Sequence, residues 1–231
     1  MECSYCSIKT AIGKLRSKPI ESILDDFRDG IERGYKNFQL VGDNAGSYGL
    51  DIKTHLGRLL TRISEIEGDF KLDLTDINPA YLHLILDPAL ELASEGRISR
   101  LYVPIQSGSS RILKLMKRGC DVEAVKVALG RIKDSIPNGV GFKLGTSVIV
   151  GFPTETDEEL RKTIEFCQDV KFDWVWCHSF SVRPETPAAK MGGQLGADEI
   201  LGRANILKKE LFVRTLVTTA EDTAGSRTCQ G

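Results

Sequence analysis

The first residues of this chain that could do chemistry are two cysteines near its start. Cys3 and Cys6 lie in the stretch MECSYCSIKT with two residues between them, and basic residues such as Lys14 and Arg16 follow closely. Positive neighbours favour the thiolate, the form of cysteine that binds iron or zinc. A complete metal or iron-sulfur site needs three or four ligands, so the pair alone is consistent with part of such a site, a redox pair or chance.

Five further stretches carry polar residues directly after segments with strand-like composition: GDNAGSYG, TDINP, PIQSGSS, GFPTET and SVRPETP. In parallel α/β folds, ligands bind at the carboxyl ends of the strands. An open doubly wound sheet and a complete or partial barrel are both compatible with this pattern. Polar loops after this many strands favour the mouth of a barrel over a single crevice.

Two of these loops have a structural and a functional interpretation. Gln106, Ser107 and Ser109 could hydrogen-bond to sugar hydroxyls, but a serine before an apolar helical pattern also predicts a helix cap. Thr156 followed by acidic residues predicts a capped helix whose carboxylates complement the helix dipole. Gly151 is not explained by capping, and a glycine at a barrel mouth allows a ligand to approach the backbone.

The remaining histidines and cysteines give weaker signals. His55 and His83 fall in predicted helices and are interpreted as structural, whereas the role of His178 stays open. Cys167 and Cys177 are interpreted as small buried hydrophobic residues. No Ser-His-Asp arrangement, nucleotide phosphate loop or pair of catalytic carboxylates can be assembled from the sequence.

Composition limits the class of protein. With 231 residues, 41% hydrophobic and 27% charged, the chain is typical of a soluble globular protein, and the net charge of -1 gives no general signal for nucleic acid or membrane. The sequence has no apolar run that could span a bilayer and no secretory signal pattern. Six cysteines in a chain of this length do not indicate a disulfide scaffold. These features predict a cytoplasmic protein.

Apolar periodicity predicts strands that alternate with helices, which is typical of a parallel α/β sheet. Helices are predicted at 19–33, 54–66, 79–93, 111–132, 158–170 and 197–219. Strands are predicted at 37–41, 70–74, 98–105, 141–150 and 172–182. The small polar residues of 221–231 predict a disordered tail.

Five motifs, taken together and in order, resemble one enzyme family. They are CSYCSIK with GKLRSKP, QLVGDNAGSYGLD, VPIQSGSSRILKLMKRG, VIVGFPTETDEEL and FSVRPETPAAKM. In this order they resemble the methylthiotransferase branch of the radical S-adenosylmethionine (SAM) enzymes, the MiaB-like and RimO-like proteins. The likeness runs from Glu2 to about Arg214, and five ordered motifs are far more specific than any single one.

This resemblance implies an α/β fold, a partial (β/α) TIM-like barrel of radical SAM type that lacks its first strand. It implies a radical SAM core at 1–191, followed by a C-terminal helix and disordered tail at 192–231. The amino-terminal methylthiotransferase domain and the carboxyl-terminal TRAM domain of the family are then expected to be absent. In the family a CxxxCxxC loop holds a 4Fe-4S cluster. Cys3 and Cys6 match its second and third cysteines, and the first would fall before the chain begins.

The resemblance also implies roles for residues in the other loops. Tyr5 matches the aromatic residue between the cluster cysteines, and Arg183 matches a catalytic position near the substrate mouth. The residues implied to contact SAM are Gly42, Asp43 and Asn44 at its methionine end, Gln106 and Ser107 at its ribose, and Gly151, Phe152 and Pro153 along its adenine.

The implied reaction is reductive cleavage of SAM to a 5'-deoxyadenosyl radical for thiomethylation of a C–H bond, most often in a tRNA adenosine next to the anticodon. The implied partners are tRNA and an electron donor such as flavodoxin or ferredoxin, with a second 4Fe-4S cluster in the amino-terminal domain. Three alternatives stay open: methylthiolation of a ribosomal-protein aspartate, a truncated inactive fragment, and an iron-free barrel that binds another phosphate or sugar ligand.

Overall fold

The computed structural model describes residues 3–211 and 216–219, and the chain divides into two compact units. Unit one comprises residues 1–13, 105–122 and 145–231. Unit two comprises residues 14–104 and 123–144. Both units contain parallel strands and the helices that connect them, which confirms the predicted α/β class.

Unit two contains three short parallel strands. β1 pairs with β2 and β2 pairs with β3, with an irregularity between Leu72 and Asp73. The strands are β1 (Asn37–Leu40), β2 (Lys71–Leu74) and β3 (Ile98–Tyr102). The helices of this unit are α2 (Ile20–Glu32), α3 (Leu56–Ser64), α4 (Leu82–Ser94) and α6 (Val122–Ser135), the last of which begins at the boundary between the units.

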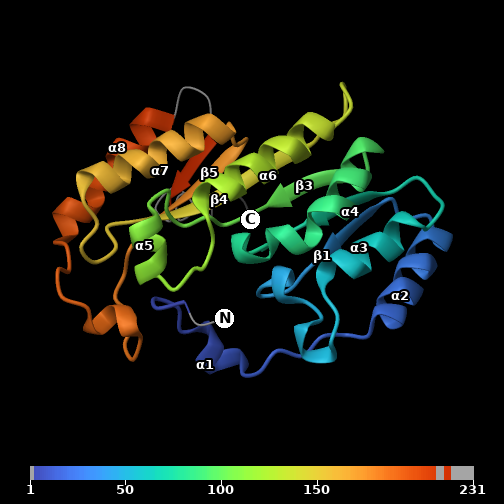
Figure 1. The fold of residues 1–231 in the computed structure, drawn as a ribbon, viewed down its shortest axis with the longest axis horizontal. Coiled ribbons are helices and arrows are strands. Elements are labelled where there is room, and N and C mark those ends of the chain that lie inside the picture. Colours follow the sequence, from blue (N-terminus) through green and yellow to red (C-terminus); the bar gives the residue numbers. More distant parts are fainter. Residues whose placement is uncertain (1–2, 212–215, 220–231) are drawn as a thin grey trace, which may run out of the picture. The chain divides into compact units, whose positions relative to one another are not determined.

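Aromatic side chains join α2 to the strands of unit two. Phe27, on the buried face of α2, stacks on Phe38 with ring centroids 4.0 Å apart and meets the edge of Phe70 at 4.9 Å. Farther along, α3 and α4 lie side by side (Figure 1). Their close approach requires Gly57, because a Cβ at this position would lie 1.9 Å from the carbonyl oxygen of Leu84.

Unit one contains β4 (Lys143–Val150, whose first two residues belong to unit two), β5 (Trp174–Ser179) and β6 (Leu216–Thr219). β5 pairs in parallel with both β4 and β6. The helices are α1 (Ile8–Ile12), α5 (Ser110–Leu115), α7 (Asp157–Val170) and α8 (Ala197–Leu211), with a short 3-10 turn η4 (Pro187–Lys190). α7 and α8 lie side by side, and α8 packs on β5 (Figure 1).

The predicted helix at 111–132 is wrong in its middle. The chain forms α5, then leaves helical geometry, and resumes as α6 at Val122. The break has a physical cause: Lys117 adopts a φ of 56°, and buried Ser4 donates hydrogen bonds to the carbonyl oxygens of Leu115 and Met116. Those carbonyls are among the groups that a helix end leaves without intrahelical partners.

The predicted helix at 197–219 is also wrong at its end. α8 stops at Leu211, and residues Leu216–Thr219 form β6, which extends the sheet beside β5. Parallel pairing gives the backbone of β5 partners on both sides, which a continued helix would not supply. The predicted disordered tail lies outside the described residues. Within residues 3–211 and 216–219, no helix has the length and apolar character needed to cross a bilayer.

Candidate functional site

The two amino-terminal cysteines lie on a tight turn that is fixed by the serine between them. The Cys6 N–H donates to the carbonyl oxygen of Cys3 at 3.3 Å, and both side chains are half-buried. Ser4 is fully buried; its N–H donates to Met116 O at 3.0 Å and its hydroxyl donates to Leu115 O at 2.7 Å. The cysteine turn is therefore held against the carboxyl end of α5.

A buried arginine lies beside this turn. Arg118 Nη1 donates to Cys3 Sγ at 3.6 Å and to Tyr5 Oη at 3.3 Å. The Tyr5 ring meets the fully buried ring of Phe152 edge-on, with centroids 6.4 Å apart, and burial raises the pKa of Tyr5, so that its hydroxyl stays protonated. The Cys3 sulfur thus has a positive charge on one side and an aromatic wall nearby.

These residues fit part of an iron-sulfur site. Thiolate sulfurs are the usual protein ligands of such clusters. Among the described residues, however, no group of three or more histidine, cysteine or carboxylate side chains could hold a metal ion. In the described part of the chain, the cysteine turn thus offers two thiols, Cys3 and Cys6, which is fewer than a complete cluster site needs.

Gln106 occupies an unusual position beside β4. Its backbone φ is 74°, its N–H donates to Ser147 O at 2.8 Å, and its carbonyl accepts from the Ile149 N–H at 2.9 Å. Its side-chain nitrogen donates to Ser147 Oγ at 3.2 Å, but no donor among the described residues reaches its buried Oε1. A strained residue with an unused buried acceptor is suited to accept a hydrogen bond from a ligand hydroxyl.

The neighbouring serines already have partners within unit one. The Ser107 hydroxyl lies 3.3 Å from Thr163 Oγ1 and accepts from the Ser109 N–H at 3.1 Å. Ser109 Oγ accepts from the Ile112 N–H at 3.3 Å, which confirms the predicted cap of α5. Of the three side chains considered for sugar hydroxyls, Gln106 is the one with an unused buried acceptor in the described structure.

The loop after β4 is shaped by a glycine and a buried acid. Gly151 has a φ of 76°, and a Cβ at this position would lie 2.5 Å from Ile200 Cγ1 of α8, so α8 occupies the space where its side chain would be. The Gly151 N–H donates to Glu155 Oε2 at 2.7 Å. Burial raises the pKa of Glu155 to about 7. The hydrogen bond from Gly151 and the charge of Arg203, whose Nη1 lies 3.5 Å from Glu155 Oε2, both act to lower this pKa but are outweighed. Packing of α8 thus gives a structural reason for Gly151, and Pro153 is buried in the same loop.

The residues implied for the methionine end of SAM belong to unit two. Gly42, Asp43 and Asn44 follow β1, and Asn44 precedes a 3-10 turn at Ala45–Ser47. The buried Oδ1 of Asn44 has no hydrogen-bond donor among the described residues. This acceptor is the second one, after Gln106 Oε1, that lies in a predicted ligand loop.

Arg183 follows β5 and is exposed on the wall of a cavity of about 420 Å³ in unit one. Partial burial lowers the pKa of His178, whose side chain keeps an exposed face. The polar side chains that line the cavity come from the end of β5, the loop after it, α8 and the cysteine turn: Tyr5, His178, Ser179, Ser181, Arg183, Asn205 and Lys208.

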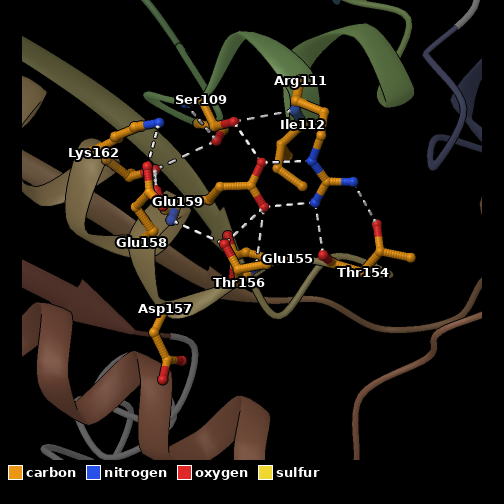
Figure 2. Close-up of polar contacts among 12 residues, drawn as sticks. Ser109, Arg111, Ile112, Thr154, Glu155, Thr156, Asp157, Glu158, Glu159 and Lys162 are labelled. Carbon is orange, nitrogen blue, oxygen red and sulfur yellow. Dashed lines mark hydrogen bonds and ion pairs between the residues drawn. The ribbon is translucent and has the colours of Figure 1, made fainter.

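The sequence interpretation missed three buried or half-buried charges that organise unit one: Arg111, Arg118 and Arg203. Thr156 caps α7 as predicted, and together with Glu159 it forms a capping box. Glu159 also pairs with Arg111 across two loops (Figure 2). Nothing in the helical or strand periodicity marks such a pair, because its two members lie 48 positions apart.

Cys167 and Cys177 are both 1% exposed, as expected of buried hydrophobic residues.

Residues 1–167 match the family model described as the radical SAM superfamily. This chain belongs to the radical SAM superfamily. Among curated proteins it is 32% identical to threonylcarbamoyladenosine tRNA methylthiotransferase MtaB of Thermotoga maritima, over 90% of this chain and 47% of that protein. It is 36% identical to the tRNA-2-methylthio-N(6)-dimethylallyladenosine synthase of Fusobacterium nucleatum, over 84% of this chain and 44% of that protein. The chain spans about half the length of these relatives.

Solved radical SAM structures share the fold. Coproporphyrinogen III oxidase HemN of Escherichia coli matches with a TM-score of 0.62 at 17% identity, over 93% of this chain and 50% of that one. The radical SAM methyltransferase TsrM of Kitasatospora setae, with cobalamin and a [4Fe-4S] cluster bound, matches with a TM-score of 0.59 at 15% identity, over 81% and 36%. The predicted α/β fold of radical SAM type is confirmed. Membership of this superfamily supports SAM and a [4Fe-4S] cluster as cofactors, and the methylthiotransferase relatives support a transferase.

Proposed function

We propose that this chain is the radical SAM core of a tRNA methylthiotransferase, with residues 1–191 as the core. One observation carries the proposal: the similarity to two tRNA methylthiotransferases extends over 84% to 90% of the chain. The geometry of unit one supports it, because Cys3 and Cys6 lie on a fixed turn beside a buried guanidinium.

When bound, the cluster and SAM supply a one-electron cleavage that yields a radical able to remove hydrogen from an unactivated carbon. The residues of this chain bind and orient those groups. Cys3 and Cys6 bind iron, Gln106 Oε1 accepts from the SAM ribose, and the rings of Tyr5 and Phe152 exclude water. Arg183 contacts the substrate from the wall of the 420 Å³ cavity.

The remaining implied contacts are part of the same proposal. Gly42, Asp43 and Asn44 hold the methionine end of SAM, Ser107 lies near its ribose, and the loop of Gly151, Phe152 and Pro153 runs along its adenine. The buried acceptor of Gln106, which has no donor in the described structure, supports the ribose contact.

We propose a tRNA adenosine next to the anticodon as the substrate, because the names of both relatives contain a modified adenosine of tRNA. The proposal includes a second 4Fe-4S cluster as the sulfur source, an electron donor such as flavodoxin or ferredoxin, and a cytoplasmic location. No site for the second cluster or the donor is assigned within the described residues.

Analysis of modified nucleosides tests this function. The complete open reading frame that contains this chain is expressed in a host that lacks its own tRNA methylthiotransferases, and tRNA nucleosides are analysed by mass spectrometry. We expect a methylthio group on an adenosine with the wild-type protein and its absence with Cys3→Ala or Cys6→Ala. Unmodified tRNA together with a methylthiolated aspartate in a ribosomal protein would contradict the tRNA assignment.

A further inference from the structure

A bidentate ion pair joins the first turns of α5 and α7, two helices of unit one. The 106–109 loop precedes α5, and the 151–156 loop precedes α7. Arg111 Nε donates to Glu159 Oε1 at 2.7 Å, and Arg111 Nη2 donates to Glu159 Oε2 at 2.6 Å (Figure 2). Paired parallel hydrogen bonds of this kind fix orientation as well as distance.

The Glu159 carboxylate is bonded on both oxygens. Oε1 accepts from Ser109 Oγ at 2.8 Å as well as from Arg111, and Oε2 accepts from the Thr156 N–H at 3.0 Å. The side chain is only 8% exposed. Burial alone would raise its pKa, but hydrogen bonds from Arg111, the Thr156 backbone and Ser109 lower it to about 2. Glu159 is therefore ionised across the working range of a protein.

This arrangement exceeds what a helix cap requires. A capping box needs only the reciprocal contacts between Thr156 and Glu159. Here the second carboxylate oxygen, Oε1, accepts hydrogen bonds from outside α7: Figure 2 shows Ser109, of the 106–109 loop, and Arg111, of α5, converging on it. The pair thus links the start of α5 to the start of α7.

Arg111 also holds a strained residue in place. Thr154 has a φ of 67°, which is rare for a β-branched residue. Arg111 Nη2 donates to Thr154 O at 2.7 Å and Arg111 Nη1 donates to Thr154 Oγ1 at 3.1 Å. Backbone strain of this kind persists only where the surroundings determine the conformation, and it concentrates at functional sites.

A second set of contacts brings the same elements together. The Gly108 N–H donates to Thr163 Oγ1 of α7 at 2.9 Å, and a Cβ on Gly108 would lie 2.4 Å from Lys162 O. The 106–109 loop therefore packs directly on α7. The Arg111–Glu159 ion pair holds the start of α7, which follows the 151–156 loop, against the same part of the chain.

We propose that Glu159 and Arg111 are positioning residues that hold the 106–109 and 151–156 loops at the spacing needed to bind SAM. The inference rests on the proposed function, which assigns the ribose to the first loop and the adenine to the second. Neither residue contacts the cysteine turn in any described interaction. Loss of the pair is expected to weaken SAM binding while the iron content and the chemical step stay the same.

Kinetics and binding with matched variants test the inference. Glu159→Gln removes the negative charge that forms the ion pair with Arg111. Glu158→Gln is the control: it removes a neighbouring glutamate whose pair with Lys162, at 2.8 Å, is exposed on α7. Each variant is made in the complete reading frame, loaded with iron and sulfide, and assayed for SAM affinity by equilibrium dialysis and for SAM cleavage.

We expect Glu159→Gln to raise both the Kd and the KM for SAM at least tenfold, with iron content unchanged and kcat within about threefold. Glu158→Gln should leave all of these within twofold. If Glu159→Gln does not fold, Arg111→Gln, which removes the half-exposed partner, should raise the Kd in the same way, and Arg111→Lys should restore only part of the affinity because it lacks the planar fork.

Two negative results have different meanings. A wild-type protein that cleaves SAM, together with a folded Glu159→Gln or Arg111→Gln variant whose Kd for SAM is unchanged, would overturn this inference and leave the proposed function standing. A wild-type protein that binds iron but neither binds nor cleaves SAM would overturn the proposed function and, with it, the role of the pair.

Discussion

At the residue scale, two neighbouring glutamates have pKa values shifted in opposite directions: Glu155, in the loop before α7, and Glu159, in the first turn of α7. Glu159 receives hydrogen bonds from Arg111, Thr156 and Ser109, and these keep its pKa low despite burial. Glu155 is more deeply buried and receives one backbone hydrogen bond, so burial dominates and raises its pKa. The number of donors around each carboxylate, rather than its position in the sequence, decides which effect is larger.

The raised pKa of Glu155 predicts a pH-dependent stability. A carboxyl whose pKa is about 4.5 in the unfolded chain and about 7 in the folded one destabilises the fold as it ionises. The stabilisation of the fold by the protonated Glu155 carboxyl is fully present below about pH 4.5 and is lost as the pH rises through about 7. Relative to Glu155→Gln, the wild-type free energy of unfolding should fall by roughly 2 to 3 kcal/mol between about pH 5 and about pH 8.

Urea titrations of both proteins at a series of pH values check this expectation. The groups around Glu155, namely Arg203, Asp157 and Glu159, are present in both proteins, so the difference between the two series reports mainly the titration of Glu155. A difference in unfolding free energy that is constant across this pH range would contradict the account of the Glu155 environment.

At the element scale, periodicity predicts the existence of most helices and strands but not where long-range contacts end them. The helices at α2, α3 and α7 lie where apolar spacing and capping residues indicate. The break between α5 and α6 depends on Ser4, over 100 positions away, and the end of α8 precedes a strand that pairs with β5. Contacts of this kind leave no local pattern in the sequence.

The contact between the 106–109 loop and α7 gives a prediction for this scale. Gly108→Ala should lower the free energy of unfolding by about 1 to 3 kcal/mol, because the new methyl group would overlap the backbone of Lys162 and Thr163. Gly202→Ala is the control: it lies within α8, where the added methyl group would have no described atom within 4 Å, and it should raise stability by up to about 1 kcal/mol.

Thermal and denaturant unfolding of the two glycine variants distinguishes these expectations. Equal small changes in both variants would show that the 106–109 loop can move away from α7 at little cost. In that case, the spacing of the two loops would not depend on the tight packing at Gly108.

At the scale of the whole molecule, ordered motifs identify the family where composition does not. A net charge of -1 and ordinary hydrophobic content fit many enzymes, whereas the motifs around Cys3, Gln106 and Gly151 indicate radical SAM chemistry. The match of residues 1–167 to the superfamily confirms that prediction. The roles of half-exposed Arg111 and of buried Arg118 and Arg203 could not be predicted, because they depend on partners that only the folded chain brings near.

The central claim, that Cys3 and Cys6 bind the cluster that cleaves SAM, has one direct measurement. The complete reading frame is purified anaerobically, loaded with iron and sulfide, reduced, and mixed with SAM, and 5'-deoxyadenosine is quantified beside the cluster absorbance. We predict both signals for the wild type and for the control Cys167→Ala, whose thiol is buried, and at least a hundredfold less 5'-deoxyadenosine for Cys3→Ala and Cys6→Ala. Undiminished 5'-deoxyadenosine from either of these two variants, or none from a cluster-loaded wild type, would contradict the claim.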